Sequence, residues 1–141
     1  MRDFANSVEV RRAISPAAAK TDNTAFVSQI IDVSGFSMLL FAILLGSLAD
    51  ADATFTVLVE HGDAANLSDA AAVPDVQLTG SEASAGFTFA DDNKVRKIGY
   101  VGSKRYVRLT ITPANNTGDA YVSAVAILSG GRYLPTAAQS A

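Results

Sequence analysis

The chain has 141 residues, of which 49% are hydrophobic and 18% charged, with a formal net charge of −3 and no cysteine. This length suits a single domain, here residues 1–141, and the lack of cysteine excludes a disulfide framework and thiolate chemistry. Charged residues are fewer than the roughly one quarter of an average soluble protein, so part of the surface is expected to contact another protein. No apolar stretch follows residues 1–3, so we expect a chain made in the cytoplasm without a signal peptide.

The first strand is predicted over residues 8–14, where Val8 and Val10 precede a stretch that Ser15-Pro16 ends. The residue before a proline is driven to extended geometry, which favours this boundary. Residues 25–31 alternate between two faces and predict a second strand. The terminal segments 1–7 and 132–141 are expected to be extended arms.

The central feature is the stretch 36–48, in which eight apolar residues from Met38 to Leu45 follow one another without a polar break. Glycines on both sides of this short run favour a strand, although its periodicity alone also permits a helix. It is far shorter than the roughly 18 apolar residues of a membrane span. Because apolar residues on both faces need cover on both faces, we expect a strand buried on both sides.

The second half of the chain repeats the strand pattern. Residues 62–80 break it with a loop, in which Ser68-Asp69 predicts one helical turn at 70–72. Residues 120–128 are apolar on both faces and predict a second central strand. Strands that alternate between apolar and polar residues are predicted at 54–60, 95–101 and 106–112.

About eight short strands separated by turns predict an all-β fold, an antiparallel β-sandwich of jelly-roll type. A small barrel is the alternative. No repeat of fixed period is present, which argues against propellers and solenoids.

Catalytic chemistry has little support in the sequence. His61 is the single histidine, and no Gly-x-Ser-x-Gly motif accompanies it, so we expect no enzyme and no cofactor. Asp50-x-Asp52 and Asp91-Asp92-Asn93 offer oxygen ligands for calcium, but these residue types also dominate turns for backbone reasons. We therefore predict no metal site.

Charge is divided unevenly along the chain. Residues 21–93 contain acids but neither lysine nor arginine, and a group of cations follows them. This basic cluster consists of Lys94, Arg96, Lys97, Lys104, Arg105 and Arg108. Two interpretations stand side by side: a docking surface for another protein, or pairing with the acids of neighbouring strands. The acidic surroundings argue against nucleic acid as the partner.

Three strings resemble small head decoration proteins, or cement proteins, of tailed bacteriophages. They are FADDNKVRKIGYVGSKRYVRLTITPANNTG at 89–118, GSLADADATF at 46–55 and RYLP at 132–135. The resemblance spans roughly residues 24–135. It implies a jelly-roll-like sandwich on the outer surface of the phage head that holds neighbouring major capsid proteins together, with no catalytic residue.

These expectations define a structural virion protein whose partners are the major capsid protein and a second copy of itself, in a two-fold dimer. The basic cluster is a predicted contact, as are Val8 and Val10, whose strand could pair with a partner's sheet. Neither a membrane nor a nucleic acid is expected as a partner. The alternatives are a sandwich protein of the phage tail or fibre base, and a carbohydrate-binding jelly roll, for which four tyrosines and no tryptophan provide few stacking surfaces.

Overall fold

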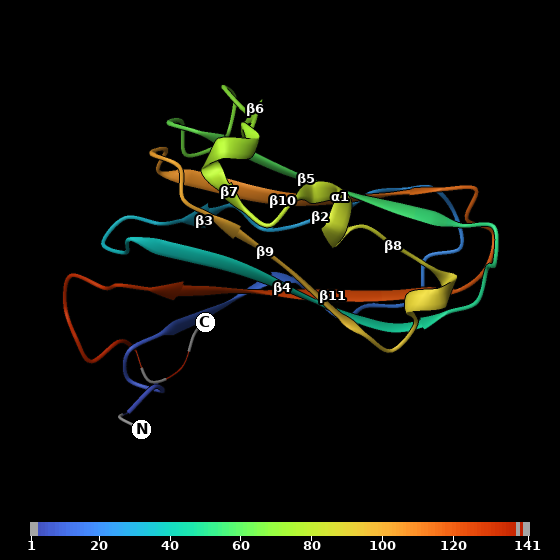
Figure 1. The fold of residues 1–141 in the computed structure, drawn as a ribbon, viewed down its shortest axis with the longest axis horizontal. Helices are drawn as coiled ribbons and strands as arrows, with labels where there is room; N and C mark the ends of the chain where they lie inside the picture. The colour runs from blue at the N-terminus through green and yellow to red at the C-terminus, as the bar shows by residue number, and fades with distance from the viewer. Residues whose placement is uncertain (1–2, 138, 140–141) are drawn as a thin grey trace.

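The computed structural model describes residues 3–137 and 139, in which two antiparallel β-sheets pack against each other (Figure 1). Sheet A contains β1 (Glu9–Ile14), β11 (Ala120–Ser129), β4 (Met38–Leu48), β9 (Val95–Tyr100) and β7 (Leu78–Thr79), in that spatial order. Sheet B contains β2 (Phe26–Val27), β3 (Ile31–Asp32), β10 (Tyr106–Ala114), β5 (Thr54–Gly62), β6 (Ala71–Ala72) and β8 (Phe87–Thr88). The predicted antiparallel β-sandwich is confirmed.

The strands of sheet B are centred on the β10–β5 pair, which runs in register from Tyr106 opposite Gly62 to Ala114 opposite Thr54. The short β2 and β3 both pair with β10, while β6 and β8 pair with β5. The one α-helix in the described part of the chain, α1 (Glu82–Ala85), starts with a capping box between Ser81 and Ser84. No helix among the described residues is long and apolar enough to cross a membrane.

The core lies between the two sheets and comes from alternate residues of the four longest strands. On the sheet A side it contains Phe41 and Ile43 of β4 and Ala126 of β11. Val59 of β5 and Leu109 of β10 face them from sheet B, and all five side chains are fully buried. One inward-facing row of side chains per strand is therefore enough to fill the space between the layers.

The prediction that residues 36–48 are buried on both faces is wrong. β4 is central within its sheet, with β11 on one side and β9 on the other, but only one of its faces meets the second sheet. Met38 and Leu44, on the other face, are 52% and 56% exposed. A two-layer sandwich covers each sheet once, and no described segment of the chain forms a third layer over β4.

Two predicted elements differ in detail from the structure. Residues 25–31 form two short strands, because the Ser28 hydroxyl accepts a hydrogen bond from the Leu109 N–H at 2.9 Å in place of a backbone carbonyl. The helical turn predicted at 70–72 is instead strand β6, which pairs with Glu60 and His61 of β5. Helical geometry appears after Pro74, in a 3-10 turn over Asp75–Gln77.

The described parts of the two terminal segments lie close together at one end of sheet A (Figure 1). Within the predicted arms 1–7 and 132–141, residues 1–2, 138 and 140–141 lie outside the described part of the chain. The Ser7 N–H donates to the Phe4 carbonyl at 3.0 Å, so this part forms a turn, not an extended arm. The Thr136 N–H donates to the Asn6 carbonyl at 3.0 Å, which fixes the C-terminal segment beside the N-terminal one.

Candidate interaction surface

Five of the six cations of the basic cluster form ion pairs with carboxylates of this chain. The nitrogen–oxygen distances are 3.4 Å for Lys94–Asp91, 2.5 Å for Arg96–Asp91, 2.5 Å for Lys104–Asp63, 2.9 Å for Arg105–Asp32 and 3.1 Å for Arg108–Glu60. The Arg105 guanidinium holds the pKa of Asp32 below its usual value by hydrogen bonding. These five cations therefore pair with acids of this chain, but only Arg108 and Glu60 belong to two paired strands, and a contact between the cluster and another protein stays a prediction.

Lys97 is the sixth cation of the cluster and differs from the others. It is exposed, it points outward from β9, and it makes no ion pair with any described carboxylate. The residue opposite Lys97 on β4 is Ala42, which also points away from sheet B. Lys97 thus belongs to the outer surface of sheet A.

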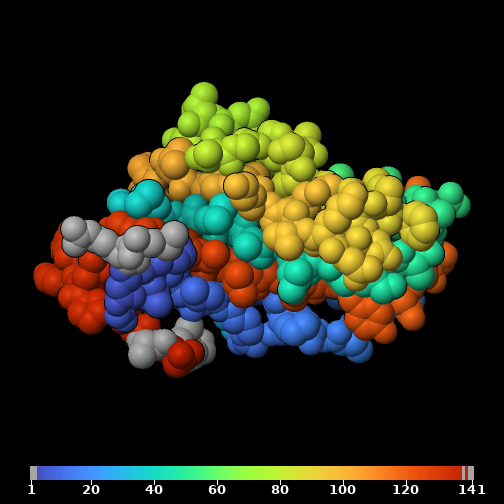
Figure 2. All heavy atoms as spheres, turned by 60° about the horizontal axis from the view of Figure 1, so that its bottom comes forward, coloured from blue at the N-terminus to red at the C-terminus, as the bar shows by residue number. Residues whose placement is uncertain are grey.

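The outer surface of sheet A is predominantly apolar. We call it the apolar face and define it by the outward-pointing residues of four adjacent strands. They are Val10 and Arg12 of β1, Tyr121, Ser123, Val125 and Ile127 of β11, Met38, Leu40, Ala42 and Leu44 of β4, and Val95 and Lys97 of β9. Figure 2 shows these strands side by side, in yellow, teal, orange-red and blue.

Strand register arranges these side chains in rows across the sheet. One row runs from Val10 through Ile127 to Leu40. The next row contains Arg12, Val125, Ala42 and Lys97, so that an apolar centre lies between two cations. A third row contains Ser123, Leu44 and Val95. None of the outward residues in these rows is acidic.

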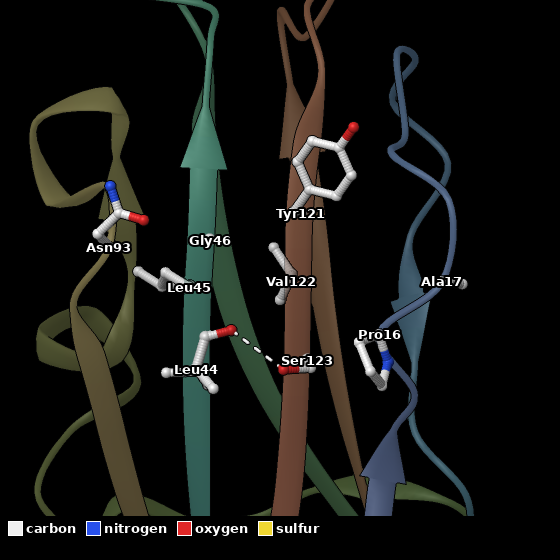
Figure 3. A pocket seen from close by; sticks show the side chains of 9 residues that line it. All are labelled: Pro16, Ala17, Leu44, Leu45, Gly46, Asn93, Tyr121, Val122 and Ser123. Atoms are coloured by element: carbon white, nitrogen blue, oxygen red, sulfur yellow. Dashed lines mark hydrogen bonds between the residues drawn. The ribbon is translucent and has the colours of Figure 1, made fainter.

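A shallow cleft lies at one end of the apolar face, where the β4–β11 register shifts (Figure 3). Here Tyr121 opposes Gly46, and a side chain on Gly46 would approach the Tyr121 Cβ to 3.0 Å, so glycine allows the close approach. The cleft encloses about 330 Å³ and is lined mainly by apolar groups, with Leu44 and Tyr121 along the strands and Pro16 and Asn93 on either side. The cleft is large enough to receive a side chain of a binding partner.

The free edge of β1 is engaged at both of its ends by hydrogen bonds within the chain. The Val8 carbonyl accepts a hydrogen bond from the Thr136 hydroxyl at 2.6 Å, and the Ala13 carbonyl accepts one from the Gln29 N–H at 2.9 Å. Val8 is buried, whereas Val10 is 45% exposed and belongs to the apolar face. Of the two valines predicted as contacts, Val10 is therefore accessible through its side chain.

His61 of β5 connects the two sheets through a hydrogen bond to Tyr100 of β9. Its Nδ1 lies 2.9 Å from the Tyr100 hydroxyl, which also accepts a hydrogen bond from the Lys104 N–H at 3.0 Å. Burial, and secondarily the positive charge of Lys104, lower the pKa of His61. Burial raises the pKa of Tyr100. The arrangement is a neutral hydrogen-bonded pair between β5 and β9, and the absence of enzymatic activity stays a prediction.

In the acidic turns, the carboxylates of Asp50 and Asp91 accept hydrogen bonds from backbone N–H groups. Asp50 accepts hydrogen bonds from the N–H groups of Thr117 at 2.8 Å and Asp52 at 2.9 Å, which lower the pKa of its carboxyl group. Asp91 accepts one from the Thr88 N–H at 3.1 Å. No group of three potential metal ligands occurs among residues 3–137 and 139.

The apolar runs of β4 and β11 are the feature of the sequence that corresponds to the apolar face. The unbroken apolar run of β4, and the similar run of β11, predicted burial on both faces within one chain. The structure buries one set of alternate residues and leaves the other set outside, where no layer from the described part of the chain covers it. Arg12 was not predicted as a contact residue, because its place beside Val125 depends on the pairing of β1 with β11.

No family model matches the chain, and no curated protein matches it in sequence. The fold is similar to the exported protein XepA of PBSX, with a TM-score of 0.53 and 16% identity over 97% of this chain and 41% of that one. It is also similar to VP2 in a subviral particle of infectious bursal disease virus, with a TM-score of 0.54 and 13% identity over 91% of this chain and 33% of that one. The chain spans less than half of either protein, and the likeness concerns the fold alone.

Proposed function

We propose that this protein is a structural component of a phage particle that binds the outside of the head and holds neighbouring major capsid proteins together. The observation that carries the proposal is the apolar face, because a contiguous apolar patch on a small domain marks a contact with another protein. The resemblance of the sequence to head decoration proteins supports the location on the head. The shared fold with a viral capsid protein and a PBSX protein is compatible with it.

The apolar face suits a protein that binds a repeating surface. A flat sheet face can bury surface area against a partner without a change in backbone conformation. The strands that carry the apolar face are held in place by the core on their other side. When many copies each join two capsid subunits, modest single contacts add up through effective concentration. The function then requires no active site, which fits the hydrogen-bonded roles of His61 and the acidic turns.

A binding experiment with undecorated heads tests the proposal. Leu44→Asp on the apolar face should weaken attachment by thirtyfold or more, since an uncompensated carboxylate in an interface costs at least ~2 kcal/mol. Thr112→Asp on the exposed outer side of β10 is the matched control and should bind as the unmodified protein does. Heads that resist heat equally well with and without the bound protein would contradict a cementing role.

The same experiment separates the two alternative functions. A protein of the tail or fibre base would bind tails and leave heads bare, with the same sensitivity to Leu44→Asp. A carbohydrate-binding module requires accessible aromatic rings for stacking on sugars. Tyr100 is buried and hydrogen-bonded to His61, so one of the four tyrosines is not accessible for that role.

A further inference from the structure

We propose that the surface docking on the apolar face is acidic at its edges and apolar at its centre, and that it does not belong to an identical face of a second copy. The inference rests on the proposed function for the identity of the partner as a capsid protein. Its basis is the row Arg12–Val125–Ala42–Lys97, which places one cation at each end of an apolar centre.

The two cations are available to a partner. Lys97 makes no ion pair with a described carboxylate, and Arg12 donates from Nη1 to the Ser15 hydroxyl at 2.9 Å without contacting any described acid. Six other cations of the chain have a described carboxylate within 4 Å, so Arg12 and Lys97 are among the minority of described cations without one. Both cations lie on strands of one rigid sheet.

The spacing of the cations defines the complementary pattern. Arg12 and Lys97 are three strands apart, and strands lie about 4.8 Å apart, so their backbone positions are separated by about 14 Å. A matching partner presents two carboxylates at about that spacing, on either side of apolar side chains that cover Val125 and Ala42. Complementary charges at the edges of an interface fix its orientation and accelerate association.

Symmetry argues against an identical face as the occupant. If two copies pack face to face about a two-fold axis centred on this row, Arg12 meets Arg12 of the other copy when the axis runs along the row, and Lys97 when the axis runs across it. Each such arrangement places cation against cation and supplies no carboxylate, which is unfavourable. The predicted two-fold dimer would therefore have to use another surface.

The cleft between Pro16 and Asn93 adds a third point of recognition. It lies beside Leu44, one row away from the cations, and its volume of about 330 Å³ accommodates one large apolar side chain. Anchor residues of interfaces usually occupy such desolvated pockets. The partner is thus expected to project an apolar side chain beside its acidic pair.

The test measures binding to undecorated heads for the double variant Arg12→Glu/Lys97→Glu. Exposed ion pairs each contribute modestly, so reversal of both charges should weaken binding about tenfold at low salt, and the difference should diminish at high salt. Arg132→Glu is the matched control, because Arg132 is exposed, lies outside the apolar face and forms no ion pair among the described residues. It should bind like the unmodified protein.

Failure of the inference and failure of the proposed function give different results. If the unmodified protein binds heads and the double variant binds equally well, the acidic partner is wrong while the function stands. If nothing binds heads, the function fails, and sedimentation of the purified protein decides the inference. A monomer that Leu44→Asp does not change then supports the part of the inference that excludes a second copy, whereas a dimer that Leu44→Asp dissociates overturns the inference, because a second copy would cover the face.

Discussion

The outer surfaces of the two sheets differ although their inner surfaces are equivalent. On sheet B, outward residues of β5 and β10 are mostly threonine or charged, and Glu60 pairs with Arg108 across the strands at 3.1 Å. On sheet A, the corresponding rows contain leucine, alanine and valine, and the cations at their ends have no carboxylate partner. The outer surface of sheet B is therefore polar and suited to contact with water, whereas the outer surface of sheet A is apolar like its inner surface.

The largest effect is expected from two adjacent residues of β4 that point to opposite sides. Ile43→Asp places a carboxylate in a fully buried position and should prevent folding, since the cost of several kcal/mol is comparable to a total stability of about 5–15 kcal/mol. Leu44 is 56% exposed, so Leu44→Asp should change the free energy of unfolding by no more than about 0.5 kcal/mol. Thermal melting followed by circular dichroism compares the two. A loss of folding in Leu44→Asp would mean that the outer side of β4 is covered.

The hydrogen bond that joins the sheets gives the next largest effect. Tyr100→Phe removes the hydroxyl that bonds His61 Nδ1 and accepts from the Lys104 N–H, which leaves two polar groups without a partner. The expected cost is about 1–3 kcal/mol in the free energy of unfolding, measured by urea denaturation. Tyr106→Phe, on the outer side of β10, serves as control. Equal stability of the two variants would show that water replaces the cross-sheet bond.

The alternation of apolar and polar residues was enough to predict the sandwich and its long strands. What remained hidden depends on contacts far apart in the sequence. The division of residues 25–31 into β2 and β3 results from the bond between Ser28 and Leu109. The outer position of Leu44 results from the number of layers in the fold, which an apolar run does not reveal. The row containing Arg12 and Lys97 requires the register of three strand pairs.

Stability should depend on pH in two steps because of groups with different roles. His61 has a lowered pKa, caused first by burial and then by Lys104, with Asp63 and Asp69 opposing the shift. Below pH ~6.5 the imidazole of His61 therefore takes up a proton more readily in the unfolded chain than in the folded one. The free energy of unfolding consequently decreases as the pH is lowered. Asp32 has a lowered pKa, and its stabilising contribution is lost only as pH falls below about 4.

His61→Gln separates these two steps. The variant should lose the slope of stability between neutral pH and about pH 5 while keeping the acid step of the carboxylates. Denaturation curves over this pH range measure both. An unchanged slope near pH 6 would assign the effect to another group, since His61 is the single histidine of the chain.

The smallest effect compares a cation of each outer surface. Arg108→Gln leaves Glu60 without its partner in a half-buried pair, and should reduce the free energy of unfolding by less than about 1 kcal/mol. Lys97→Gln breaks no ion pair with a described residue and should leave stability unchanged. Binding to heads should reverse the order, because Lys97 lies on the apolar face and Arg108 on the opposite side of the sandwich. A cation that affects stability but not binding, beside one that affects binding but not stability, would establish that the two sheets have separate tasks. Equal effects of both variants in both measurements would remove that distinction.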